Sequence, residues 1–575
     1  MKILYAIAGA AVTAVVLVAT TGAVSSKSPA KASTAPNALH GKHVSSAAVA
    51  KYWKAHNDAA PAQLQTALSS FGAVAKAAPT ASTTRHSAPP GLVDFSALQG
   101  TGYPQSGSSL AECTNTGNAA QYVLGSANDY AGLFGTDANV SDFSYSADGN
   151  SFTKGGRFAN VTFSDSTSVP TSGNPTVASA GSAANDLNCL FWVGGTATSD
   201  DGTHSGVFVA RTSANTLNGS CSGDACFPTK KLVVQSIDGT GATLHDAPDL
   251  AVGTNGSTHT RSVAVADTLF TATGSNIELT LCDAGLASCG TAVVDGEVPS
   301  SSGNFDQFPT VTFTPQGNVV VAWAYYNYGS GDALGMDGLA VELRDISCTP
   351  TSATAFTCGT MHTIYRDTAP MSDSTNAVKD IPFQVTESPR INQIGTSRIF
   401  ATWNSCGDNG AANDAFGRCD DTKVNFSYST DGGSTWSAPA VVASGAGHQL
   451  QPSKPQLAGS KVVVSYYSTG NALSLTGRNI GYDEYLASAT YSGTPAFTTS
   501  RVTTAPTWPA ADWWQLAEQS IGDTQGLATT GASSSTVWAD FTANYDDEPI
   551  ANDIYSGSIK PASQQDNYLA KRTAP

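Results

Sequence analysis

Residues 424–442, VNFSYSTDGGSTWSAPAVV, contain the stretch that decides the fold of this chain. Within it, residues 429–436 fit the spacing S-x-D-x-G-x-T-W at all five fixed positions. Ser429 and Asp431 can cap the backbone N–H groups of a tight turn. Gly432 and Gly433 can adopt the positive φ values that such a turn needs, and Trp436 can bury a large face at the start of the return strand. The stretch predicts a hairpin with a structural role.

A shorter copy of this pattern lies nearer the N-terminus. Residues 143–153, FSYSADGNSFT, repeat the same core, with Phe152 in the place of Trp436 and one residue fewer in the turn. Two similar turns between similar strands indicate an internal repeat, which is the signature of a β-propeller.

The N-terminus is typical of a secretory signal. Lys2 is followed by an apolar run to about Ala19 and then by small residues through Ser26, so residues 1–25 are expected to be removed. An uncleaved signal anchor is the alternative, because the run approaches the ~18 apolar residues of a membrane span. No membrane span is expected after signal removal. Residues 26–100, rich in Ala, Ser, Thr and Pro, are interpreted as a low-complexity pro-segment, linker or wall-facing stalk.

The remainder of the chain is acidic, and the formal net charge of the whole sequence is −17. This charge argues against nucleic acid as a partner, because phosphate binding needs positive charge. We expect a secreted monomer, with association with the cell wall as a further possibility. Residues 101–560 are expected to form one domain, and residues 561–575 a C-terminal tail.

The ten cysteines favour disulfides, because their number is even and the chain is expected to be secreted. Four pairs are close in sequence and can each close a local loop: Cys221–Cys226, Cys282–Cys289, Cys348–Cys358 and Cys406–Cys419. Cys113 and Cys189 remain, and could join the first repeat to the second. No CxxC occurs, so a zinc site of that type is not expected.

One pattern recurs from Ala111 onward. An acidic or polar residue, often followed by Pro, begins a short strand, and a more apolar strand follows, as in Asp306-Gln307-Phe308-Pro309 before NVVVAWAYY. Similar starts occur near residues 246, 387, 451 and 521, and two further segments cover 117–165 and 174–236. The fold class is therefore all-β: a single propeller of about seven four-stranded blades, with six blades plus extra strands as the alternative.

The 429–436 motif, the D-x-P starts and the closing segment IGDTQGLA…VWADF resemble the sialidase-like superfamily of β-propellers, also called Asp-box or BNR-repeat proteins. The resemblance covers roughly residues 111–560. It implies that the two turns are structural and that a glycan is bound or processed elsewhere. The family's early Arg-Ile-Pro motif has no counterpart, since the nearest text, Pro389-Arg390-Ile391-Asn392, lies in mid-chain.

Strands of a blade alternate in direction, so the blade starts and the loops between second and third strands share one face, called here the top face. Acidic and aromatic residues gather in these segments, and such residues suit sugar binding. For a glycosidase, the expected catalytic residues are Asp306, Glu387 and Arg390. The expected substrate-binding residues are Asp246, Asp249, Tyr325, Trp403, His448 and Asp523.

Simpler interpretations of these residues stay open. An Asp at a strand start often only satisfies backbone donors, and Trp or Tyr in a second strand often packs between blades. No cofactor is expected, although Ca²⁺ could bind the carboxylates. Two functions remain: a carbohydrate-active enzyme, either a glycosidase of sialidase-like type with paired carboxylates or a polysaccharide lyase, or a non-catalytic propeller that binds a glycan, a similar polar ligand or a protein.

Overall fold

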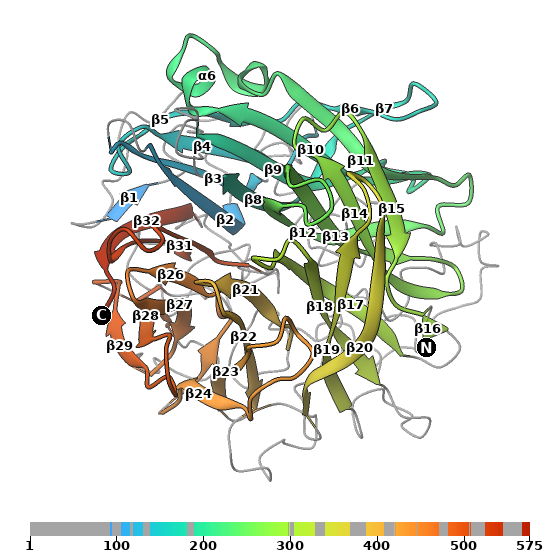
Figure 1. Cartoon of the computed structure of the whole chain (residues 1–575). Coiled ribbons are helices and arrows are strands. Elements are labelled where there is room, and N and C mark those ends of the chain that lie inside the picture. Colours follow the sequence, from blue (N-terminus) through green and yellow to red (C-terminus); the bar gives the residue numbers. More distant parts are fainter. Residues whose placement is uncertain are drawn as a thin grey trace, which may run out of the picture.

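The computed structural model describes residues 92–94, 105–115, 119–129, 138–180, 189–296, 298–299, 304–327, 340–367, 387–406, 419, 421–445, 447–470, 481–504, 506–507, 524–543 and 566–575. Within these residues the chain forms seven antiparallel sheets, each with a main path of four strands. The sheets are arranged around a centre like the blades of a propeller (Figure 1). The predicted all-β propeller and its count of seven blades are confirmed.

The first three blades follow in chain order. Blade 1 contains β2 (Gln105–Thr114), β3 (Gln121–Asp129), β4 (Asp142–Ser146) and β5 (Phe152–Arg157). Blade 2 contains β8 (Thr171–Ala180), β9 (Leu190–Thr198), β10 (His204–Ser213) and β11 (Thr229–Ile237). Blade 3 contains β12 (Leu244–Thr254), β13 (Arg261–Phe270), β14 (Gly274–Asp283) and β15 (Cys289–Val293), and β16 (Val298–Pro299) also pairs with β14.

The next three blades repeat this order. Blade 4 contains β17 (Phe305–Phe313), β18 (Val319–Asn327), β19 (Ala340–Pro350) and β20 (Phe356–Asp367). Blade 5 contains β21 (Arg390–Ile394), β22 (Arg398–Cys406), β23 (Thr422–Ser429) and β24 (Ala440–Ala443). In blade 6 the first strand is divided into β25 (Gln449–Leu450) and β26 (Gln456–Ala458), followed by β27 (Lys461–Ser468), β28 (Asp483–Thr490) and β29 (Thr498–Arg501).

Blade 7 closes the ring with strands from both ends of the chain. It contains β30 (Gly526–Thr529), β31 (Thr536–Ala543) and β32 (Asp566–Thr573), and β1 (Leu92–Asp94) pairs with β32 as the outermost strand. Two expected boundaries therefore change. Residues 561–575 are not merely a tail, because β32 supplies the third strand of the last blade, and part of the expected 26–100 linker supplies its fourth.

Only short elements lie outside the blades in the described residues. A two-stranded sheet, β6 (Val161–Thr162) with β7 (Ser168–Val169), follows blade 1, and the helix α6 (Ala214–Asn218) and a 3₁₀ turn (Gly223–Cys226) follow β10. None of the described helices is long and apolar enough to cross a membrane. The expected signal sequence lies outside the described residues.

Apolar side chains of neighbouring blades pack against each other. The second strands supply the largest of them, because these strands lie in mid-sheet and are covered on both faces: Trp192, Trp323, Trp403 and Trp538 are all fully buried. Trp403, for example, packs at 5.1 Å between ring centroids against Tyr365 of blade 4. The interpretation of these tryptophans as core residues between blades is the one the structure supports.

The 429–436 turn forms the hydrogen bonds expected of it. The Asp431 carboxylate accepts from the backbone N–H of Thr435 at 2.8 Å and from its hydroxyl at 2.7 Å, and the Ser429 hydroxyl donates to Asp431 at 2.8 Å. Trp436 of blade 5 contacts the neighbouring blade, because its indole N–H donates to Asp345 of blade 4 at 2.9 Å. The turn joins the third and fourth strands, at the end of the blade opposite the top face, and it connects two blades.

The shorter copy is used in the same way. Asp148 accepts from the backbone N–H groups of Asn150 and Ser151 at 2.8 and 2.9 Å, and the indole N–H of Trp538 from blade 7 donates to the Gly149 carbonyl at 2.8 Å. Both turns therefore connect neighbouring blades, which agrees with the structural role expected of them.

All ten cysteines form disulfides, in the five predicted pairs. Four bonds close loops within 13 residues of sequence. Cys113–Cys189 spans 76 residues and joins blade 1 to blade 2.

Candidate functional site: the central channel

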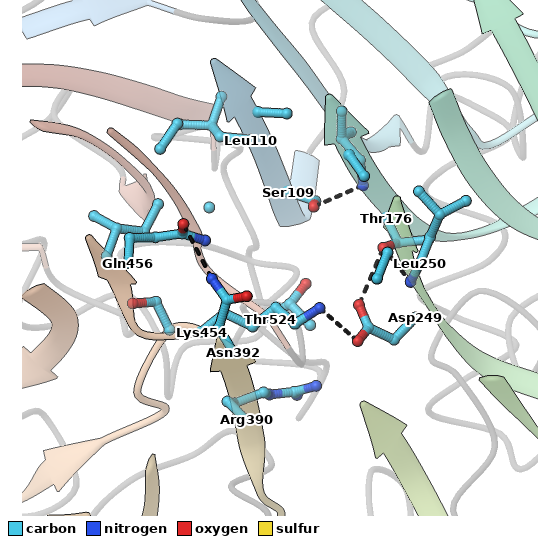
Figure 2. A pocket seen from close by; sticks show the side chains of 18 of the residues that line it. Ser109, Leu110, Thr176, Asp249, Leu250, Arg390, Asn392, Lys454, Gln456 and Thr524 are labelled. Carbon is cyan, nitrogen blue, oxygen red and sulfur yellow. Dashed lines mark hydrogen bonds and ion pairs between the residues drawn. The ribbon is translucent and has the colours of Figure 1, made fainter. Parts of the chain in front are cut away.

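A cavity of about 360 Å³ lies at the centre of the propeller, and all seven blades line it. The innermost strands surround it, since each of β2, β8, β12, β17, β21, β26 and β30 contacts the next and β30 returns to β2. Its lining is rich in hydroxyl, amide and charged groups (Figure 2). This cavity is called the channel below.

A repeated irregularity shapes the channel wall. In blades 2, 3, 4 and 6 the residue before a Pro has a φ between +45° and +56°: Asn174, Ala247, Phe308 and Gln451. In blades 2, 3 and 4 the register of the first strand shifts at this point, as it does in blade 1 between Ser106 and Ser109. Such a bulge re-aims the side chains that follow it.

The residues just after the bulge link the blades around the channel. Their side-chain oxygens accept a backbone N–H from the first strand of the following blade. Ser109 accepts from Val177 at 2.9 Å, Thr176 from Leu250 at 3.1 Å and Asp249 from Val311 at 2.7 Å. In blade 4, Thr310 accepts from Ile391 at 3.4 Å. Blade 5 has Arg390 at the corresponding place, one residue after Pro389, so a cation replaces the acceptor there.

An ion pair crosses the channel. Lys454 of blade 6 lies 2.7 Å from Asp249 of blade 3, nitrogen to oxygen (Figure 2). Its ammonium also donates to the Val311 carbonyl at 3.1 Å. Asp249 is held further by the hydroxyls of Thr176 at 3.2 Å and Thr310 at 2.9 Å. These contacts fix one carboxylate and one ammonium inside a polar cavity.

Further polar groups surround the ion pair. The Asn392 side chain donates to the Pro455 carbonyl at 2.9 Å and to Gln456 at 3.2 Å, and its oxygen accepts from Thr312 at 3.2 Å. On the other side of the channel, burial raises the pKa of Glu112 to about 7, an effect that a hydrogen bond from Thr114 partly offsets. The described lining of the channel therefore contains two cations, Arg390 and Lys454, and two carboxylic groups, Glu112 and Asp249.

Of the nine residues predicted for the site, the structure brings Asp249 and Arg390 together in the channel wall. A second pair lies in blade 4, where Asp306 and Tyr325 are cross-strand partners. Arg344 stacks on the Tyr325 ring, 3.6 Å from its centroid, and Asn304 donates to the Tyr325 hydroxyl at 3.0 Å.

Asp306 is almost fully buried and accepts the indole N–H of Trp323 at 2.7 Å. Burial raises its pKa to about 6, and hydrogen bonds from Asp295 and Trp323 and the charge of Arg344 act against this rise. Glu387 is also buried, and its backbone carbonyl accepts from the Tyr326 hydroxyl at 3.0 Å. Neither Asp306 nor Glu387 belongs to the described lining of the channel.

Of the other predicted residues, Asp246 accepts from the Asn174 side chain at 2.6 Å and is buried. His448 is buried too, and its backbone N–H donates to Thr469 at 2.7 Å. Trp403 lies in the core described above. Asp523 lies outside the described residues.

Sequence reasoning missed Lys454 and Glu112. Lys454 follows the predicted blade start at Gln451-Pro452 by two residues, so its position in the sequence could have indicated that it lines the channel. Glu112 offers no comparable signal, because its blade begins without the Pro motif. Also missed were three fully buried acids of blades 1, 6 and 7, Asp142, Glu484 and Asp540, whose pKa values burial holds well above the usual range.

No family model and no curated protein matches the sequence. Among solved structures, the GH93 α-L-arabinofuranosidase of Fusarium graminearum is 13% identical, with coverage of 69% of this chain and 93% of that chain and a TM-score of 0.36. An α-L-arabinanase of Penicillium chrysogenum is 10% identical, with coverage of 84% and 98% and a TM-score of 0.37. Trypanosoma rangeli sialidase is 10% identical, with coverage of 72% and 57% and a TM-score of 0.33. At these levels the similarity carries no argument about activity.

Proposed function

We propose that this protein is a secreted propeller that binds a glycan at the channel. The observation that carries the proposal is the convergence of Arg390, Lys454, Asp249 and Asn392 in one polar cavity. Fixed donors and acceptors suit a ligand covered with hydroxyl groups, because each hydroxyl both donates and accepts. Arg390 adds a planar set of donors that also suits a carboxylated sugar.

Secretion is supported by the five disulfides, since such bonds persist in oxidising compartments. The removal of residues 1–25 and an association with the cell wall are part of the same proposal. Mass spectrometry of the exported protein tests the first of these, because an intact Met1 in a membrane fraction would contradict it.

Hydrolysis of the glycan is the second candidate, and the raised pKa of Asp306, about 6, favours it. A carboxylic acid that keeps its proton up to about pH 6 can act as a general acid in mildly acidic solution. Glu387 is its proposed partner. A retaining mechanism would need the two carboxyl groups about 5–5.5 Å apart and an inverting mechanism about 6.5–9.5 Å. Asp306 already accepts the indole N–H of Trp323, and both Asp306 and Glu387 are buried. Glycan binding is therefore better supported by the geometry than hydrolysis.

The experiment that separates the two is a screen of the purified protein on aryl-glycosides, a sialoside included, and on a glycan array. Binding alone predicts array signals without turnover in the wild type. Turnover that falls at least 100-fold in both Asp306→Asn and Glu387→Gln would establish the hydrolytic candidate instead. Absence of both turnover and binding would contradict the proposal.

A further inference from the structure

Blade 3 contains a buried cluster of metal-ligating side chains that is separate from the channel. His245 on β12, Asp267 on β13 and Glu278 on β14 each offer one ligand atom, and these atoms lie within 4.8 Å of one another. The three strands are adjacent, and Asp267 is the cross-strand partner of Glu278. None of the three lines the described channel.

The imidazole of His245 is held at both nitrogens. Its Nε2 lies 2.9 Å from the hydroxyl of Ser236 on β11, and its Nδ1 lies 2.7 Å from Asp267 Oδ2 and 3.6 Å from Glu278 Oε2. When Nε2–H donates to Ser236, the Nδ1 lone pair faces the two carboxylates. The lone pairs of His245 Nδ1, Asp267 Oδ2 and Glu278 Oε2 then face the same small space. Only a proton or a cation in that space makes the arrangement favourable.

Two carboxylate oxygens in the cluster lack hydrogen-bond partners among the described residues. Asp267 has a fully buried side chain, and its Oδ1 accepts no hydrogen bond. Glu278 Oε2 also accepts none, although its side chain is only 12% exposed. Buried carboxylate oxygens without a donor are costly, because neither water nor protein compensates for the lost solvation. A bound cation would supply that compensation.

We propose that His245, Asp267 and Glu278 form a binding site for a divalent transition-metal ion of the Mn²⁺ or Zn²⁺ type. One imidazole nitrogen with two carboxylate oxygens suits these ions better than Ca²⁺, which prefers six to eight oxygen ligands. With a neutral imidazole, the two carboxylates balance the charge of the ion.

The distances agree with this assignment. Metal–ligand bonds of about 2.0–2.2 Å in a tetrahedron separate the ligand atoms by roughly 3.3–3.6 Å. The Nδ1–Oε2 distance of 3.6 Å is already of this size, and the Nδ1–Oδ2 distance of 2.7 Å needs to open by less than 1 Å. The ion would hold three strands of blade 3 together, and Ser236 of blade 2 would orient its imidazole ligand.

The test uses the full-length secreted protein, first stripped with a chelator and then dialysed against Mn²⁺, Zn²⁺, Ca²⁺ or Mg²⁺. We expect about one equivalent of Mn²⁺ or Zn²⁺ to remain bound and the melting temperature to rise with it, because the ion binds the folded state. Glu278→Gln keeps the size of the side chain and removes its charge, and it should lower metal affinity at least 10-fold. Asp283→Asn, at an acid at the C-terminal end of β14, is the matched control and should bind as the wild type does.

Retention of metal by Glu278→Gln at the wild-type level would overturn the proposal, as would a wild type that retains no metal. If Glu278→Gln does not fold, the wild type still decides the question through its Co²⁺ complex. The proposed ligands predict a visible d–d absorption band that Zn²⁺ abolishes and Ca²⁺ leaves intact. Absence of that band would contradict the site.

Discussion

At the scale of single residues, the 429–436 turn depends on short polar side chains and on two glycines. Gly432 and Gly433 both have positive φ, +74° and +99°, as the sequence predicts. Their surroundings differ. A Cβ on Gly432 would meet nothing within 4 Å, whereas a Cβ on Gly433 would lie 2.5 Å from Asp345 Oδ2 of the neighbouring blade. The sequence reveals the need for glycine at both positions but not this contact between blades.

The two glycines therefore make a matched pair of variants. Gly432→Ala should cost about 1 kcal/mol of unfolding free energy, from its backbone conformation alone. Gly433→Ala should cost about 2–3 kcal/mol, because steric overlap with Asp345 adds to the backbone strain. Denaturant unfolding measures both. Equal losses would show that the contact with Asp345 contributes nothing.

Asp345 also predicts a pH dependence of stability. Burial raises its pKa to about 8, an effect that the hydrogen bond from Trp436 opposes and the charge of Asp431 increases. The folded state therefore keeps a proton that the unfolded chain releases near pH 4, so stability falls as pH rises from about 4 to 8. Asp345→Asn keeps the acceptor for Trp436 and should flatten this fall by up to about 1.4 kcal/mol per pH unit. Parallel pH profiles of the variant and wild type would contradict the assignment.

At the scale of elements, the blade starts explain both the success and the limits of prediction from sequence. The Pro at the predicted starts locates the first strands of blades 3, 4, 5 and 6, and alternation then gives the direction of the others. The bulge before that Pro is not visible in the sequence, because Ala247 and Phe308 are residues that rarely adopt positive φ. Tertiary packing imposes this conformation. Because the register of the strand shifts between Asp246 and Asp249, Asp249 rather than Asp246 lines the channel.

The same limit applies to the aromatic and acidic site residues. A Trp in a second strand more often belongs to the core than to a ligand platform, but only the packing of a neighbouring blade assigns Trp403 to the core. Lys454 pairs with Asp249 across 205 residues of sequence, a contact that no local pattern encodes.

The disulfides differ in the stability that we expect from them. In the chain-entropy account, closing a loop of 76 residues stabilises by ~4.5 kcal/mol, and closing one of 7 residues by ~2.4 kcal/mol. Replacing both members of Cys113–Cys189 by Ala should therefore lower the unfolding free energy more than the same change at Cys282–Cys289. Denaturant titration of the two variants under non-reducing conditions measures the difference. A smaller loss for the longer loop would reject this account.

At the scale of the whole molecule, closure of the ring depends on a short strand. Leu92, Val93 and Asp94 pair with Ala570, Leu569 and Tyr568, so β1 covers the otherwise open edge of β32. An uncovered edge strand invites aggregation. A chain that begins at Phe95 should therefore melt at lower temperature and aggregate earlier than one that begins at Pro89. Identical melting and light-scattering curves would show that β1 is dispensable.

The proposed binding of a glycan at the channel is tested most directly by titrating the best array glycan into the wild type, Arg390→Gln and Arg398→Gln. Arg398 is the matched control, since it belongs to the same blade but donates to the Tyr491 and Gly493 carbonyls outside the channel lining. We predict that Arg390→Gln weakens binding about 10–100-fold, as expected for a lost charged hydrogen bond, and that Arg398→Gln leaves the affinity unchanged. Unchanged affinity in Arg390→Gln, or an equal loss in both variants, would contradict the claim.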